Sequence, residues 1–466
     1  MRGGRHRARI VSFATSFTVA ASLATALPAH ATVGLGPASR LDPQIFADGM
    51  VLQREMSVPI FGNADPAEEV TVTFNGQVKI TNADTGGRWR VDLDAMPAGG
   101  PYTLTAAGSA NTVVVNDVMV GEVWVASGQS NMVIVHVKTE ELAAHPEVRV
   151  FYKRSWGGHP GTVPWLFAKE LAQELGCTVG ILNQAIGGSL IKLWLGPTVY
   201  EDPDPELAAF LAVIRGVGVY YDMYVAPLQP FAIRGVAWWQ GEADDRTPLP
   251  HREFFPALIR SWRREWGQGN FPFIYVELPT GRGLKFNQPV HALPPNASAI
   301  DRQAFRRHTF LIGLTEPKTS MVITNDLDGG THPVDRASYS HRIAQHVLAK
   351  VYGRDLVYSG PLLASQTIEG SSIRIHFRAG TAEGLQASGG PLQGFAVSAD
   401  GETWHWANAV IEGNEVVVSS PEVPSPTLAR YAWGERPTWA NLFNGAGLAA
   451  APFATDVTPQ DYGDLP

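Results

Sequence analysis

The chain has 466 residues, a formal net charge of −8 at pH 7 and a single cysteine, Cys177. The excess of acidic over basic residues argues against nucleic acid as a partner, because binding to phosphate backbones depends on clustered Lys and Arg. One cysteine excludes an intramolecular disulfide, so stability has to come from core burial, and the length allows two or three domains with substantial cores.

Residues 1–31 have the features of a cleaved secretion signal. Arginines crowd the first nine residues, an apolar run extends from 10 to 27, and Ala29-His30-Ala31 has the small-x-small form of a cleavage site. The alternative is a membrane anchor, but the run is short and contains several Ser and Thr residues. Nothing later in the chain reaches the ~20 consecutive apolar residues of a spanning helix. We therefore expect a secreted protein, extracellular or periplasmic, that has no membrane association once the signal is removed.

Residues 41–116 have the pattern of a small antiparallel β domain. In the segment EVTVTFNGQVKI, Val70, Val72 and Phe74 alternate with threonines, and Asn75-Gly76 is a strong hairpin-turn signal. Further alternating segments follow at GGRWRVDL and PYTLTAAG.

From 117 to 355 apolar strands alternate with helices. The segment PWLFAKELAQELG begins with proline, carries apolar residues at helical spacing and ends with glycine, and FFPALIRSWRREWG and SYSHRIAQHVLAKVYG are two further amphipathic segments. Strands that alternate with helices predict an α/β domain built on a five-stranded parallel sheet with helices on both faces. The strands are expected at 119–126, 178–183, 233–239, 272–278 and 320–325.

The helical pattern ends near residue 356, and residues 356–456 are predicted to form a C-terminal β module. Its segment GFAVSADGETWHWANAVIEGNEVVVSS contains three strands with turns at Asp400-Gly401 and Gly413-Asn414. Within the α/β domain, the segment 279–300 is too long for a plain connection and is interpreted as a functional loop. It contains Asn296-Ala297-Ser298, a glycosylation acceptor pattern.

Polar or glycine-rich residues follow four of the predicted strands. Because the carboxyl ends of parallel strands meet at one edge of a sheet, these residues are expected to line one crevice. In strand order they are Ser130, then Gly187-Gly188-Ser189, then Gln240-Gly241-Glu242, then Asp326, Asp328 and His332.

These residue types match the needs of acyl transfer, which uses a nucleophile, a base and donors for the oxyanion. Ser130 would attack and contribute its own backbone N–H, and His332 would accept the serine proton, because imidazole titrates near neutrality. Gly188 leaves a backbone N–H unobstructed, and the Gln240 amide can supply another donor. A carboxylate would orient the imidazole. Taken singly, each residue has an ordinary explanation as a turn, cap or surface residue; their occurrence at four strand ends favours a catalytic site.

Signatures of other enzyme classes are absent from the sequence. Met132 stands where the nucleophile elbow G-x-S-x-G needs glycine, which argues against an α/β-hydrolase. The sequence has no HExxH, paired CxxC, GxxxxGK[ST] or strand-placed GxGxxG, so neither a metal nor a nucleotide cofactor is indicated.

Several segments together resemble the secreted sialate O-acetylesterases and related carbohydrate acetylesterases of the SGNH (GDSL-like) hydrolase superfamily. VGEVWVASGQSNM resembles the family's nucleophile block, AIGGSLIKLW its glycine block, WWQGEAD its Gln-Gly-Glu block and THPVDR its histidine block. FADGMVLQREMSVPIFG and ARYAWGERPTWANLFNGAGLAAAPF resemble its flanking segments. GQSNM together with QGE and a late HP is a highly specific combination.

This resemblance implies a flavodoxin-like catalytic domain that hydrolyses acetyl esters on sugar hydroxyls without a cofactor. It implies Ser130 as the nucleophile and His332 as the base. It also implies an oxyanion hole made by Ser130, Gly188 and Gln240.

The chain departs from the family pattern around its histidine. The family's acid lies three residues before the histidine, where this chain has Gly329, and the nearest preceding carboxylate is Asp328. Either Asp328 completes a triad, or His332 is held by a backbone carbonyl in a Ser-His dyad. The family's lysine four residues after the histidine is here Arg336.

Three functions are compatible with the sequence. The first is a secreted carbohydrate O-acetylesterase that works through an acetyl-serine on sialate or another acetylated glycan. The second is a non-catalytic carbohydrate-binding protein on a degenerate esterase scaffold, and the third is an esterase for lipid or aryl esters. Retention of Ser130 and His332 favours catalysis, and sugar is favoured over lipid by tryptophans near the strand ends, namely Trp194, Trp238 and Trp239. An anionic sugar would need a local cation, for which the candidates are Lys192, Arg246 and Arg336.

Overall fold

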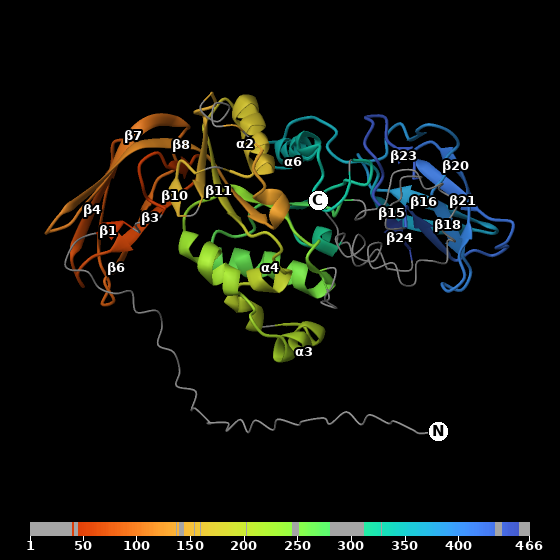
Figure 1. The fold of residues 1–466 in the computed structure, drawn as a ribbon, viewed down its shortest axis with the longest axis horizontal. Helices are drawn as coiled ribbons and strands as arrows, with labels where there is room; N and C mark the ends of the chain where they lie inside the picture. Colours follow the sequence, from red (N-terminus) through yellow and green to blue (C-terminus); the bar gives the residue numbers. More distant parts are fainter. Residues whose placement is uncertain are drawn as a thin grey trace, which may run out of the picture. The chain divides into compact units, whose positions relative to one another are not determined.

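The computed structural model describes most of the chain after the leader (Figure 1). The described residues are 40–41, 45–136, 138, 144–152, 154–158, 160–201, 203–244, 251–279, 312–327, 329–433 and 440–455. The predictions for the secretion signal, for Arg246, for residues 280–300 with Asn296, and for Asp328 fall outside these ranges. Among the helices of the described ranges, none combines the length and apolar composition needed to cross a lipid bilayer.

The N-terminal segment folds into strands that pair antiparallel, as its alternating pattern predicts, except that β2 (Val51–Gln53) pairs in parallel with β8 (Thr112–Gly128). The hairpin turn at Asn75-Gly76 is confirmed: both residues have positive φ, 45° and 77°, as a tight two-residue turn requires. Its flanking strands β4 and β5 pair residue for residue from Glu69↔Asn82 to Phe74↔Gln77. The strands of this segment are β1 (Arg40–Leu41), β2 (Val51–Gln53), β3 (Val58–Asn63), β4 (Glu69–Phe74), β5 (Gln77–Asn82), β6 (Arg88–Leu93) and β7 (Gly99–Ala107).

Strand β8 (Thr112–Gly128) belongs to both β-rich and α/β parts of the chain. Its first half pairs antiparallel with β7, and its second half pairs parallel with β11 (Val179–Ala185) and β12 (Gly235–Trp239). The boundary expected between residues 116 and 117 therefore falls inside one continuous strand.

The prediction of an α/β fold with a central, mostly parallel sheet and additional β-rich sheets is confirmed. All five predicted strands are present, but the count of five is too low, because β9 pairs in parallel with β11 and extends the sheet. Beyond β9, the short β10 pairs antiparallel and ends the sheet. The order is β10-β9-β11-β8-β12-β13-β14, with β9 at Val148–Tyr152, β10 at Ser155–Trp156, β13 at Phe273–Val276 and β14 at Thr319–Val322.

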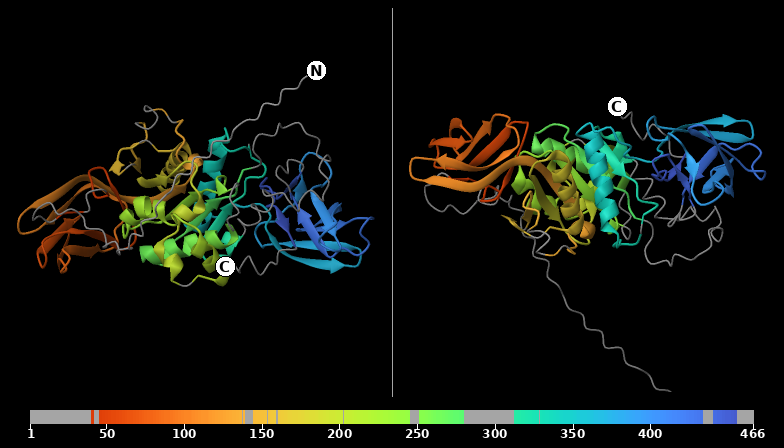
Figure 2. Two further views of the ribbon diagram at one scale, coloured as in Figure 1. Left: turned by 60° about the horizontal axis from the view of Figure 1, so that its bottom comes forward. Right: turned by 90° about the horizontal axis from the view of Figure 1, so that it is seen from above.

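Helices cover both faces of this sheet, as Figures 1 and 2 show. Strand side chains alternate between faces, so Trp124 and Ala126 pack in the same cluster as helices α2 and α6, whereas Val123 and Val125 pack in the cluster of α4. Helix α2 ends at Gly176, whose φ of 62° suits glycine. The bounds are α2 Thr162–Leu175, α3 Pro205–Val213, α4 His251–Trp266 and α6 Arg336–Lys350, with short helical turns η1 Ser130–Met132, η2 Ile191–Trp194, η3 Pro197–Tyr200, η4 Tyr221–Val225, η5 Ala226–Leu228 and η9 Ile312–Thr315.

The C-terminal segment is composed of β strands in the described range. Two four-stranded sheets have the orders β15-β16-β21-β20 and β19-β18-β22-β24, and β17 pairs with β23. The predicted turns at Asp400-Gly401 and Gly413-Asn414 connect β18 to β19 and β20 to β21. The bounds are β15 Leu363–Glu369, β16 Ser372–Phe377, β17 Gln386–Ala387, β18 Phe395–Ser398, β19 His405–Trp406, β20 Asn408–Glu412, β21 Glu415–Ser419, β22 Leu428–Tyr431, β23 Leu442–Phe443 and β24 Phe453–Ala454.

Candidate active site

The candidate nucleophile, Ser130, lies two residues after the last residue of β8. That residue, Gly128, has φ of 123°, and a Cβ placed on it would lie 2.0 Å from the carbonyl oxygen of Trp239. Only glycine fits this close approach to the neighbouring strand. The next backbone N–H, of Gln129, donates to the same Trp239 carbonyl at 2.8 Å. The chain then turns into η1, which begins at Ser130 and holds its half-buried side chain at the carboxyl edge of the sheet.

The structure brings Ser130 and His332 together, although 202 positions separate them. The Nε2 atom of His332 lies 2.8 Å from the Oγ atom of Ser130, which is hydrogen-bond distance. The histidine is exposed and belongs to the segment between β14 and α6. A nucleophile and a base in direct contact, accessible from solvent, form the arrangement that activates a serine hydroxyl.

Asn131 fixes the segment that carries His332, a role that the sequence did not reveal. Its Nδ2 atom donates to the Thr331 carbonyl at 3.0 Å and to Glu242 Oε1 at 2.9 Å. Its Oδ1 atom lies 3.5 Å from the guanidinium of Arg336 at the start of α6. The residue after Ser130 thus connects three loops at this edge of the sheet, and Glu242 is a half-buried acceptor in this network instead of a solvated loop residue.

The glycine-rich loop after β11 lies against the nucleophile. The N–H of Ile186 and the hydroxyl of Ser189 both donate to the Gly128 carbonyl, at 3.1 and 3.3 Å. A Cβ on Gly187 would lie 3.7 Å from the Cβ of Ser130, and Gly188 has φ of 72°. Within the described ranges no group accepts a hydrogen bond from the backbone N–H of Ser130 or of Gly188. Two unused donors beside a nucleophile are what an oxyanion hole needs.

The side chain of Gln240 is buried behind this loop. Its Nε2 atom donates to the Ser189 carbonyl at 2.9 Å and to Asp244 Oδ2 at 2.7 Å, so both amide hydrogens are used. The Asp244 carboxylate also accepts from the N–H of Ile191 at 3.2 Å, and His251 Nδ1 lies 3.5 Å from it. Gln240 and Asp244 therefore hold the glycine-rich loop from behind. Neither Asp244 nor His251 was singled out from the sequence, although Asp244 stands four residues after Gln240.

The remaining carboxylate and cation candidates have other partners. Asp326 makes a two-pronged ion pair with Arg342 of α6, with distances of 2.7 and 2.6 Å. The Nζ atom of Lys192 donates to the Arg215 carbonyl at 2.9 Å. Arg336 is buried beside Asn131, and burial lowers the pKa of its guanidinium. Lys192 and Arg336, two of the three predicted cations for an anionic substrate, are thus engaged within the protein.

The tryptophans near the strand ends are core residues, as tryptophans more often are, so they give no support for a sugar over a lipid. Trp194, Trp238 and Trp239 are fully buried. The indole N–H of Trp194 donates to the Ser189 hydroxyl at 3.0 Å, and that of Trp239 donates to Glu242 at 2.9 Å. They support the loops of the site from beneath, because their rings pack against helices on either face of the sheet.

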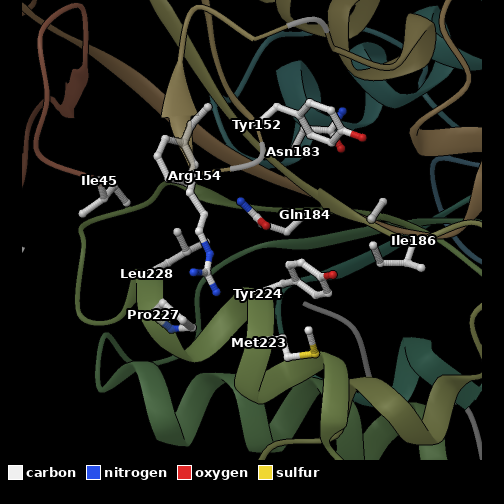
Figure 3. Close-up of a pocket in the computed structure, with 12 residues that line it drawn as sticks. Ile45, Tyr152, Arg154, Asn183, Gln184, Ile186, Met223, Tyr224, Pro227 and Leu228 are labelled. Carbon is white, nitrogen blue, oxygen red and sulfur yellow. The ribbon is translucent and has the colours of Figure 1, made fainter. Parts of the chain in front are cut away.

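A cavity of about 310 Å³ adjoins the loop after β11 (Figure 3). It combines apolar walls with amide, hydroxyl and guanidinium groups. Its lining residues are Ile45, Phe151, Tyr152, Arg154, Asn183, Gln184, Ala185, Ile186, Met223, Tyr224, Pro227 and Leu228. Within the described part of the chain, no group of three or more His, Cys, Asp or Glu side chains is arranged to hold a metal ion.

Comparison with known proteins points to carbohydrate esterases. Residues 120–304 match the family profile described as "Carbohydrate esterase, sialic acid-specific acetylesterase". The sialate O-acetylesterase of Mus musculus is 28% identical over 410 residues, which cover 67% of this chain and 74% of the relative. That of Homo sapiens is 28% identical over 380 residues, covering 67% and 71%. Among solved structures, a carbohydrate acetylesterase from Xanthomonas citri matches with a TM-score of 0.77 and 32% identity, over 90% of this chain and 100% of that chain.

Proposed function

Because the chain belongs to the family of sialate O-acetylesterase-like carbohydrate acetylesterases, we propose that it is a secreted serine esterase that removes acetyl groups from sugar hydroxyls. The contact of 2.8 Å between Ser130 Oγ and His332 Nε2 supports this proposal most directly. The unused N–H groups of Ser130 and Gly188 beside it support the same chemistry.

In the proposed reaction, Ser130 Oγ attacks the acetyl carbonyl carbon while His332 Nε2 takes the hydroxyl proton. The negative charge that develops on the carbonyl oxygen is stabilised by the N–H groups of Ser130 and Gly188. Collapse breaks the bond to the sugar oxygen, which leaves as a hydroxyl after receiving the proton from His332. A water molecule then attacks the acetyl-serine with the help of the same base, and acetate leaves as Ser130 regains its proton.

Two roles in this site are proposed in alternative forms. Gln240 acts as a third oxyanion donor only if one of its bonds, to Ser189 or Asp244, is exchanged during the reaction. Asp328 orients the His332 imidazole in a triad, or a backbone carbonyl does so in a dyad. The Asp328→Asn variant separates these two, because loss of a template aspartate costs about 10⁴-fold in kcat and a dyad would lose far less.

We also propose the SGNH (GDSL-like), flavodoxin-like assignment for the catalytic domain at 117–355. In this proposal the β segments 41–116 and 356–456 flank it, and the leader 1–31 directs secretion. The parallel order β11-β8-β12-β13-β14 supports the assignment. The shared strand β8 means that the first two segments are joined through a continuous sheet.

The proposal is tested by acetate release from a panel of acetylated sugars and from p-nitrophenyl acetate. We expect Ser130→Ala to lose at least about 10⁴-fold in kcat, as for other serine nucleophiles. Ser57→Ala is the matched control, because this exposed serine lies in the N-terminal β segment, where its hydroxyl donates to the Leu93 carbonyl at 3.3 Å. Mass spectrometry of acid-quenched enzyme should find an acetyl group on the peptide that contains Ser130.

If the wild type releases no more acetate than Ser130→Ala, the esterase proposal is wrong. Retained binding of acetylated glycans in that case would favour the carbohydrate-binding alternative.

A further inference from the structure

The hairpin between β9 and β10 places an arginine at the same sheet edge as Ser130. Tyr152 pairs with Ser155 and Phe151 with Trp156, so the chain reverses direction between β9 and β10, and Arg154 lies just before β10 at the carboxyl end of β9. Arg154 has φ of 69°, which non-glycine residues adopt infrequently and which is typical of residues in tight reversals of the chain. Because β9 runs parallel to β11 and β11 to β8, this turn and the turn at Ser130 lie at one edge with one strand between them.

The guanidinium of Arg154 extends into the cavity beside that strand. Figure 3 shows it between Leu228 on one side and Gln184 and Tyr224 on the other. No described lining residue is Asp or Glu. Over the described ranges, no residue makes an ion pair or hydrogen bond with Arg154. The cavity thus offers a planar, permanently charged group with five donors, together with amide and hydroxyl groups.

Two residues that line the cavity are hydrogen-bonded to the segment that carries Ser130. Ile186, which lines it, donates from its backbone N–H to the Gly128 carbonyl, and Asn183, also in the lining, donates from Nδ2 to the Met132 carbonyl at 3.1 Å. Two strand spacings separate β9 from β8, which is roughly 10 Å. One sugar ring with its substituents bridges such a distance.

We propose that Arg154 binds the carboxylate of the substrate, so that the preferred substrate is an O-acetylated acidic sugar with its ester at Ser130 and its carboxylate at Arg154. This inference rests on the esterase function proposed above. Arginine suits the task because its fork of N–H groups matches a carboxylate in two parallel hydrogen bonds. Lys192 and Arg336, which were candidates for this role, bind Arg215 and Asn131 instead.

The test compares each acid with its own neutral form. Substrates are O-acetylated N-acetylneuraminate and O-acetylated methyl glucuronide, each with its carboxyl methyl ester, and p-nitrophenyl acetate serves as an ester without a sugar. Acetate release is followed for wild type, Arg154→Gln and Arg154→Lys. Lys192→Gln is the matched control, because it removes the same charge from a neighbouring loop. Thermal unfolding establishes that each variant is folded.

We expect Arg154→Gln to lose roughly tenfold to a hundredfold in kcat/KM on at least one acid, mainly through KM, the size expected for charge-assisted hydrogen bonds. Its activity on the methyl esters and on p-nitrophenyl acetate should stay within about twofold of wild type, because these substrates have no carboxylate for Arg154 to bind and the residues around the ester are unchanged. On the acids, the kcat/KM of Arg154→Lys should lie between those of wild type and Arg154→Gln. The kcat/KM of Lys192→Gln should equal that of wild type.

If wild type and Arg154→Gln show the same ratio of acid to methyl ester, Arg154 does not select the substrate, while acetate release leaves the esterase proposal standing. If wild type releases acetate from none of the compounds, the esterase proposal fails and this inference fails with it.

Discussion

Replacing Asp244 with alanine should lower both the free energy of unfolding and kcat, because this carboxylate supports the glycine-rich loop from behind. It is buried and accepts hydrogen bonds from Gln240 Nε2 at 2.7 Å and from the Ile191 N–H at 3.2 Å. Alanine leaves these two donors buried without their acceptor. At about 1–3 kcal/mol for each unsatisfied donor, the free energy of unfolding should fall by about 2–6 kcal/mol.

The effect on catalysis follows from the hydrogen bond between Gln240 and the Ser189 carbonyl. Once Gln240 loses Asp244, its amide is no longer held against the Ser189 carbonyl, and the neighbouring N–H of Gly188 loses its fixed direction. Complete loss of one oxyanion donor costs about 10²–10³ in kcat, which sets the upper limit for Asp244→Ala. Asp244→Asn is the conservative control, because it keeps a carbonyl oxygen for Gln240 and should retain most of the activity.

The assay is a double-mutant cycle with Gln240→Ala, using kcat on p-nitrophenyl acetate and urea unfolding. If both residues act through the loop, the double variant should lose little more in kcat than the worse single variant, which is strong non-additivity. The reasoning is refuted if Gln240→Ala loses activity while Asp244→Ala, shown to be folded, keeps the wild-type kcat. Gln240 would then contact the oxyanion directly.

Two further predictions concern stability. Burial, followed by the charges of Arg342 and Lys350, lowers the pKa of His346 to about 3. Its folded-state pKa lies below the unfolded value of about 6.5, so the contribution of His346 to the free energy of unfolding is complete above about pH 6.5 and falls by about 1.4 kcal/mol for each pH unit toward pH 3. In urea unfolding from pH 4 to 7.5, His346→Gln should make the free energy of unfolding depend less steeply on pH. An unchanged pH dependence would contradict the low pKa of His346. Gly128→Ala would place its Cβ 2.0 Å from the Trp239 carbonyl oxygen, so it should unfold at a clearly lower temperature than wild type and lose activity, and wild-type behaviour would contradict the constraint.

The strand ends could be predicted because each signal is local. An apolar run that stops at glycine or a polar residue marks both a strand and its carboxyl end, as at Gly128 and Gln240. Parallel order then brings those ends to one edge without further information. For this reason the proximity of Ser130 and the glycine-rich loop followed from the sequence, and the contact between Ser130 and His332 agrees with it.

Other features depend on partners that no local pattern specifies. Strand β9 is short and became part of the sheet only through its pairing with β11, so neither it nor the turn at Arg154 was expected. The direction of the Gln240 amide depends on Asp244 and Ser189, which sit on two different loops. The burial of Trp238 and Trp239 reflects helices that cover both faces, and aromatic residues at a strand end look the same in the sequence whether or not a helix covers them.

The position of Ser130 is also set from the opposite end of β8. Residues 120–128 are buried throughout, and a slip of one residue would turn every side chain to the other face. Glu122 prevents such a slip, because its buried carboxylate pairs with Arg54 at 2.6 Å and Arg234 at 2.8 Å. Burial alone would raise the pKa of Glu122, but the two guanidiniums outweigh burial and lower it.

This charged cluster joins the N-terminal β segment to the catalytic sheet at a defined register. Arg54 directly follows β2, which pairs with β8, and Gln53 of β2 accepts a hydrogen bond from the Val123 N–H at 2.8 Å. A register slip would leave Glu122 facing apolar side chains with no cation. Leaving one member of a buried charge pair without its partner typically costs about 3–5 kcal/mol, so the slipped register is strongly disfavoured. The N-terminal β segment therefore does more than flank the parallel sheet: it fixes the register of the strand that ends at Gly128, two residues before Ser130.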